Sequence, residues 1–206
     1  MNSAKYYCIL FTLLLALSCC KRDNSTPPNI FSEASYPLAV GNWWKYQFTS
    51  SGSYPDTFTL RVDSMIIQSP YTKFICNYVG NGAIISAGYF LQSDTSLSFV
   101  QPYGYFTSFP SFHLRFPVET GQYWAGEFRG DSIMVVGVAD KCEGGGGYFS
   151  PCYSLVESYN LPHNFKVNDM LLTPKVGLVR QSISFNSDTP GVQIQQSVAL
   201  ISYHVQ

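Results

Sequence analysis

From residue 36 onward, apolar and polar side chains alternate along most of the chain, a spacing typical of β-strands with one buried face. The clearest example is segment 57–63, in which Phe58, Leu60 and Val62 share one face. Further strand-like segments are 72–79, 84–91, 95–101, 111–116, 131–139, 148–158, 176–185 and 192–204. Only segment 159–172 could hold a short helix, and Pro162 weakens even that.

Turn-forming residues separate several of these segments, at 54–56, 80–82, 144–147 and 188–191. About ten strands at close spacing predict an all-β antiparallel meander that forms a barrel or a strongly curved sheet. The four glycines of 144–147 are expected to form a mobile hairpin tip. A phosphate-binding loop is disfavoured because no Lys-Ser/Thr pair follows and no helix begins there.

An internal repeat links segments 36–48 and 116–128, at an offset of 80 residues. Both segments read aromatic-Pro-aliphatic-x-x-Gly-amide-aromatic-Trp-x-x-x-Phe. The repeat predicts a single domain, residues 36–206, built from two similar lobes, 36–115 and 116–206. Each lobe would open with the same tight turn, followed by a core tryptophan, Trp44 or Trp124. Sugar stacking by these tryptophans is the alternative.

The N-terminus has the organisation of a targeting segment. Its apolar run, residues 6–18, is 13 residues long and too short to span a bilayer, but it suits a signal peptide. The run ends in Leu17-Ser18-Cys19-Cys20, which resembles the lipobox of bacterial lipoproteins. This resemblance implies a signal peptide over residues 1–19 and lipidation of Cys20, with Cys19 as the runner-up. Residues 20–35 would then be the lipidated cysteine and a flexible tether.

Three motifs extend the resemblance into the domain: the two Pro-x-x-x-Gly-x-x-Trp segments, and Pro174-Lys175-Val176-Gly177-Leu178-Val179. Together they resemble a group of uncharacterised β-rich lipoproteins of the Bacteroidetes type, in which the second kind of motif pairs late in the sheet. The resemblance implies anchoring in the membrane, and Lys21 after the anchor points to the outer membrane. It carries no activity over to this chain.

Composition narrows the function classes. Charged residues make up only 12% of the chain and the net charge is −1, so no basic surface for nucleic acid is expected. Cys142 and Cys152 flank a short hairpin, and export to an oxidising compartment favours a disulfide between them. The sequence lacks zinc-ligand spacing and gives no indication of a metal or other cofactor. Cys76 falls within a strand and is expected to be buried.

The segment around Tyr103, Tyr105, Phe106 and Phe109 is the candidate contact for a small apolar or sugar ligand; alternatively it packs between the lobes. We predict no catalytic residue. An envelope hydrolase stays an alternative function, and its candidate site residues are His163 or the acids Glu119, Glu127 and Asp131. The leading hypothesis is a non-enzymatic binding or structural module, with an envelope protein as another candidate partner. The second is a carrier or chaperone for a lipid or lipoprotein.

Overall fold

The structure is a computed structural model that describes residues 36–52, 55–100, 112–125, 131–139, 141–145, 147–160, 165–186 and 193–206. All regular elements in these ranges are strands. They are β1 (Trp43–Ser50), β2 (Asp56–Gln68), β3 (Tyr71–Gly80), β4 (Ala83–Gln92), β5 (Ser96–Val100), β6 (Phe112–Arg115), β7 (Tyr123–Ala125), β8 (Asp131–Ala139), β9 (Cys142–Gly144), β10 (Gly147–Phe149), β11 (Cys152–Asn160), β12 (Phe165–Thr173), β13 (Gly177–Asn186) and β14 (Gln193–His204).

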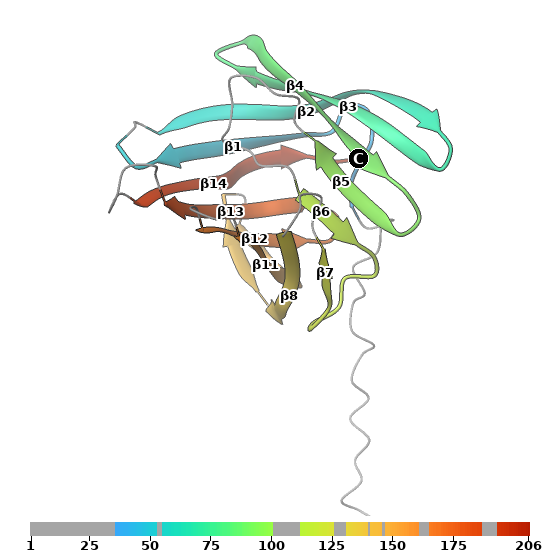
Figure 1. Cartoon of the computed structure of the whole chain (residues 1–206). Coiled ribbons are helices and arrows are strands. Elements are labelled where there is room, and N and C mark those ends of the chain that lie inside the picture. The colour runs from blue at the N-terminus through green and yellow to red at the C-terminus, as the bar shows by residue number, and fades with distance from the viewer. Residues whose placement is uncertain are drawn as a thin grey trace, which may run out of the picture.

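Twelve of these strands form one antiparallel sheet in the order β6-β5-β4-β3-β2-β1-β14-β13-β12-β11-β8-β7, while β9 and β10 form a separate hairpin. Strands β1 to β6 each lie beside their neighbour in sequence, and so do β7, β8 and β11 to β14 once the β9–β10 hairpin is left out; the first strand pairs with the last. The sheet curls into a nearly closed barrel with β6 and β7 at its two edges (Figure 1). The expected all-β antiparallel meander is confirmed, and of the two predicted forms the barrel is the one observed.

Because a meander reverses at every turn, its connections alternate between two ends of the barrel. The end of the barrel at which Tyr36 enters the fold is called the proximal end. It also carries the β2–β3 turn, the β12–β13 turn and the C-terminal Gln206. The distal end carries the β1–β2 and β3–β4 turns. Asn42, fully buried, joins both chain ends at the proximal end: its Nδ2 donates to Pro37 O (2.7 Å), and its Oδ1 accepts from Gln206 N (3.1 Å).

Inward-facing side chains fill the barrel as one continuous cluster, which runs from Tyr36 to Leu200. The half built from β1 to β6 is rich in aromatic rings. Its largest fully buried side chains include Trp44, Tyr46, Tyr78, Phe90 and Phe99. The ring centroids of Phe90 and Phe99 lie 4.6 Å apart, close enough for a favourable aromatic contact.

The two copies of the sequence repeat form the same turn. Gly41 and Gly121 have φ values of 96° and 83°, a left-handed conformation that favours glycine. In each copy the glycine N–H donates to the facing strand, and the same facing residue donates back to the amide-bearing residue. These bonds, all 2.9–3.0 Å, are Gly41 N to Val62 O, Val62 N to Asn42 O, Gly121 N to Val135 O, and Val135 N to Gln122 O. The tryptophans that follow, Trp44 and Trp124, are both buried, as predicted.

The indole N–H groups of the two tryptophans donate hydrogen bonds to different parts of the barrel. Trp124 lies on the edge strand β7, and its Nε1 donates to His113 O on the opposite edge strand β6 (3.1 Å). It thus connects the two edges that backbone pairing leaves open. Trp44 Nε1 instead donates to Val176 O in the β12–β13 turn (2.6 Å).

The hydrogen bond from Trp44 and two further contacts hold the Pro174–Val179 motif against β1 and Tyr36. Tyr46 Oη donates to Leu178 O (3.1 Å), beside the carbonyl bound by Trp44. Gly177 has a φ of 92°, and a Cβ at this position would come within 3.1 Å of the Tyr36 ring. The motif requires glycine both for its backbone conformation and for close approach, and it opens β13 late in the sheet, as the resemblance implied.

The segment with helical potential, 159–172, is not helical where the structure describes it. Its C-terminal part is β12, which is paired along both sides by β11 and β13. Asn168, Met170 and Leu172 are buried at every second position, so the period is two and not 3.6. Pairing on both edges outweighs the weak helical preference of the segment.

Replacing Trp44 by Phe should lower the free energy of unfolding by about 2–3 kcal/mol, because it leaves Val176 O without its buried donor and opens a cavity. Urea denaturation of Trp44→Phe against the parent protein measures this. The control is Trp43→Phe, a partly exposed neighbour, for which about 0.5 kcal/mol is expected. Equal losses in the two variants would show that the Trp44 indole N–H contributes nothing.

Candidate functional site

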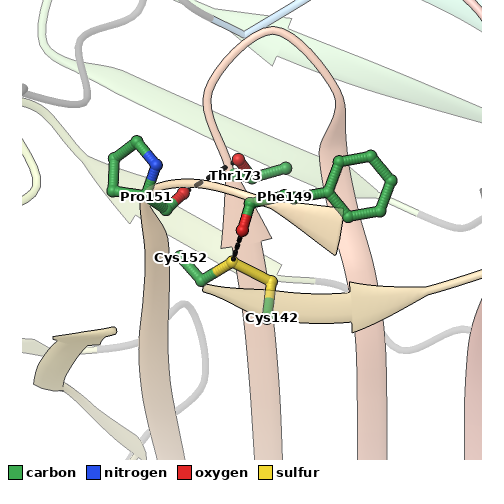
Figure 2. Close-up of a disulfide and its surroundings, with 5 residues drawn as sticks. All are labelled: Cys142, Phe149, Pro151, Cys152 and Thr173. Atoms are coloured by element: carbon green, nitrogen blue, oxygen red, sulfur yellow. Dashed lines mark hydrogen bonds between the residues drawn. A yellow bond between two sulfur atoms is a disulfide. The ribbon is translucent and has the colours of Figure 1, made fainter. Parts of the chain in front are cut away.

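The disulfide connects the β9–β10 hairpin to β11 at the proximal end. Cys142 and Cys152 are bridged, with Cα atoms 5.9 Å apart (Figure 2). The pairing agrees with the sequence prediction. Cys142 lies opposite Phe149 in the hairpin, so the two bridged cysteines are not cross-strand partners. Cys152 Sγ lies 3.3 Å from Phe149 O, a contact without a shared proton because a disulfide sulfur carries none.

Glycines of the hairpin fit tightly against the barrel. Gly145 N donates to Leu200 O (2.5 Å), and a Cβ on Gly145 would overlap the backbone of Leu200 and Ile201. A Cβ on Gly144 would come within 2.6 Å of Val179. The expectation of a mobile tip is therefore wrong for these two residues: they are glycines because β9 must approach β13 and β14 closely.

A ladder of buried polar side chains crosses three neighbouring strands inside the barrel. Asn168 Nδ2 on β12 donates to Glu157 Oε2 on β11 (2.9 Å), and Gln181 Nε2 on β13 donates to Asn168 Oδ1 (2.9 Å). All three side chains are at most 2% exposed. Gln181 Oε1 is buried and has no hydrogen-bond partner among the described residues, so this oxygen is available to accept a hydrogen bond.

A polar cleft of about 410 Å³ lies at the distal ends of β1, β13 and β14, next to this ladder. Ile183 connects the two features, since it lines the cleft and pairs with Asn168 in the β12–β13 register. The other lining residues carry only hydroxyl or amide side chains: Thr49, Ser50, Ser51, Ser182, Ser184, Gln195, Gln196 and Ser197. Thr49 Oγ1 and Ser197 Oγ are 2.5 Å apart. The cleft therefore offers neutral donors and acceptors and no formal charge.

A second, more open surface of about 290 Å³ is lined by Trp43, Lys45, Thr59, Arg61 and Val79. The Trp43 ring stacks on His204 at a centroid distance of 6.3 Å. Arg61 pairs with Asp63 (Nε to Oδ1, 2.5 Å), and this hydrogen bond lowers the pKa of the Asp63 carboxyl, helped by Asn77 Nδ2. The ion pair therefore holds Arg61 beside the tryptophan at neutral pH.

Cys76 is buried with 0% exposure, as the sequence predicted. Burial raises the pKa of its thiol to about 12, with a further contribution from the Asp63 charge. A thiol with this pKa is almost entirely protonated at neutral pH and so is a poor nucleophile. Cys76 acts as a small core residue.

Most of the sequence-derived site candidates lie outside the described residues. These are Cys19 and Cys20, the aromatic set Tyr103, Tyr105, Phe106 and Phe109, and His163 and Glu127. Glu119 is exposed in the turn before β7. Within the described ranges, no three His, Cys, Asp or Glu side chains gather as a metal site would require.

The polar ladder and the cleft were not anticipated. The alternation of buried side chains along β11 could have indicated the ladder, because it places Glu157 on the same inward face as Leu155. The cleft left no such signal, because serine and glutamine in a strand are unremarkable until β1, β13 and β14 meet.

The comparisons with known proteins concern the fold. No protein-family model matches the chain, and no curated protein matches it. A crystal structure of a protein assigned as exported, with a YmcC-like fold, from Bacteroides fragilis matches at a TM-score of 0.51 and 11% identity, covering 85% of this chain and 99% of that one. A protein assigned as a lipoprotein from Parabacteroides distasonis matches at a TM-score of 0.47 and 10% identity, covering 85% and 100%.

The first of these matches shows a shared fold: this chain has the YmcC-like β architecture. In the part of the chain that the structure describes, no helix has the length and apolar character needed to cross a membrane.

Gly145→Ala should destabilise the protein by about 2–3 kcal/mol, because its methyl group would overlap the β14 backbone and push the disulfide-bonded hairpin away from the barrel. Gly137→Ala is the control, since a Cβ there meets nothing within 4 Å. Thermal unfolding under oxidising conditions compares the two variants. A Gly145→Ala protein as stable as Gly137→Ala would show that the hairpin does not need this close contact.

Proposed function

We propose that this protein is a lipid-anchored lipoprotein of the cell envelope that acts as a non-enzymatic binding module. The anchor is the acylated Cys20, held in the outer membrane, and the ligand site is the polar cleft at the distal end of the barrel. Support for the location comes from the lipobox-like Leu17-Ser18-Cys19-Cys20 and from the fold shared with a protein assigned as exported. One observation carries the binding role: the barrel interior is filled, whereas an open cleft lies at its distal end.

The filled interior distinguishes this role from that of a carrier. A carrier needs an apolar cavity large enough to enclose a lipid chain. In the described part of this barrel, aromatic and aliphatic side chains from both halves occupy that space, with Phe99, Leu97 and Leu114 all at 0% exposure. Binding therefore takes place at the surface.

The composition of the cleft supports a proposal for the ligand class. Serine and threonine hydroxyls and glutamine amides donate and accept hydrogen bonds without attracting a net charge. Such a lining suits a neutral, hydroxyl-rich ligand, and we assign it to the sugar class. The cleft lies at the distal end of the barrel, opposite the proximal end at which the chain enters. A membrane anchor at the N-terminus would therefore leave the cleft facing away from the membrane.

The sequence repeat 36–48/116–128 and the turn that its two copies share support a proposal for the origin of the scaffold. Leaving out the β9–β10 hairpin, each half is a six-strand meander, β1 to β6 followed by β7, β8 and β11 to β14, and each opens with the same turn. We propose duplication of one six-strand unit, with the hairpin inserted into the second copy between β8 and β11.

Cys20→Ala should abolish palmitate labelling and move the protein from the membrane fraction to the soluble fraction, because it removes the acceptor thiol. Cys19→Ala is the matched control and should keep both the label and the membrane location. Metabolic labelling with fractionation reads both properties. Persistent labelling in Cys20→Ala would disprove this anchor assignment.

Filling the cleft should remove sugar binding. A panel of soluble neutral oligosaccharides, screened by isothermal titration calorimetry, should give at least one binder, and Ser182→Trp should weaken that binder at least tenfold. Ser154→Trp, an equally half-buried site on β11 outside the cleft, should leave affinity unchanged. If no oligosaccharide binds, or both variants bind like the parent, the cleft is not a sugar site.

A further inference from the structure

The β2–β3 hairpin extends beyond the barrel wall at the proximal end. β2 pairs with β1 only as far as Arg61, which lies opposite Trp43, and the turn residues Gly41 and Asn42 bond to Val62. β2 nevertheless continues to Gln68, so that beyond Val62 it has β3 on one side and no described strand on the other. At about 3.3 Å per residue, Ile67 lies about 20 Å past Arg61, where the β1 pairing ends.

Large apolar side chains of this extension are exposed on both of its faces. Met65 and Ile67 share one face and are 49% and 78% exposed, while Ile66 on the other face is 51% exposed. Tyr71, just after the turn, is 45% exposed. A strand in water normally keeps at least one polar face, so apolar exposure on both faces indicates that this tip has a partner.

The chemistry of the tip fits a lipid surface. Residues 64–72 contain no charged side chain. The first charge after the turn is Lys73, which lies opposite Ile66 in the β2–β3 register and has its ammonium 4.0 Å from the Tyr89 ring centroid. Exposed aliphatic side chains with a tyrosine and a lysine on the facing strand are the composition of segments that bind at a bilayer interface.

The position of the tip relative to the N-terminus identifies the partner. Tyr36, where the described chain begins, enters the barrel at the same proximal end from which the hairpin projects. Fifteen residues, 21–35, separate Cys20 from Tyr36. A flexible tether of that length, as the sequence predicts, would span about 20 Å, comparable to the reach of the hairpin, so an anchor at Cys20 would hold the tip close to the bilayer surface.

We propose that the β2–β3 hairpin tip, Met65 to Tyr71, inserts into the interface of the bilayer that holds the lipid anchor. This inference rests on the proposed anchoring at Cys20. Insertion fixes the barrel by two points, the acyl chains and the hairpin, and turns the distal cleft away from the membrane. A single acyl anchor on a coil would leave the orientation of the barrel free.

The test places an environment-sensitive NBD label at a single introduced cysteine in the full lipidated protein, reconstituted into phosphatidylethanolamine–phosphatidylglycerol vesicles. The labelled variants are Ile67→Cys and the control Ile84→Cys, an isoleucine that is 60% exposed at the distal end. The native domain cysteines do not compete, because Cys76 is buried and Cys142 is bridged to Cys152.

We expect a blue-shifted emission and quenching by doxyl lipids for the label at position 67, and water-like emission for the label at 84. Water-like emission at both positions, or equal shifts at both, would overturn the proposal while leaving the anchor intact. A shift at 67 that appears without vesicles and grows with protein concentration would identify a second copy of the chain as the partner, and would equally overturn it. Protein that fails to co-sediment with the vesicles contradicts the anchor itself.

Discussion

Pairing between the first and last strands of the meander is the constraint on which the barrel depends. β1 and β14 are joined along eight residues of β1, from Trp43 opposite His204 to Ser50 opposite Gln196. Without this contact the chain would form two separate six-strand sheets, each with an open apolar face. Asn42 reinforces the closure by bonding the N-terminal segment and the C-terminal residue at once, and Trp44 connects β1 to the β12–β13 turn.

Closure also explains why the N-terminal entry of the chain and the polar cleft lie at opposite ends of the barrel. Tyr36, Trp44 and the disulfide-bonded hairpin lie at the proximal end and belong to the continuous core cluster. The polar ladder and the hydroxyl cleft lie toward the distal end, where β1, β13 and β14 meet. Because antiparallel connections alternate, Tyr36 and the β2–β3 tip share the first end, and the cleft lies at the second.

Much of the fold could be predicted from local sequence patterns. The alternation in 57–63 predicted β2, and the repeat predicted two identical turns with buried tryptophans, because each depends on residues only a few positions apart. The strand at β12 could not be predicted, since its stability comes from β11 and β13. The tight packing of Gly145 was also hidden, because its partners on β14 lie more than fifty residues away in sequence. The cleft joins β1 to β13 and β14 and has no signature in any one of them.

The short strands at the edges of the barrel bear on how copies of this protein behave beside one another. The edges β6 and β7 span four and three residues, and an indole of one edge already holds a carbonyl of the other. Long free edges are templates on which neighbouring chains add strands and aggregate. Here the described edges present few unoccupied backbone groups, so neighbouring copies lack a long edge along which their sheets could merge into fibrils.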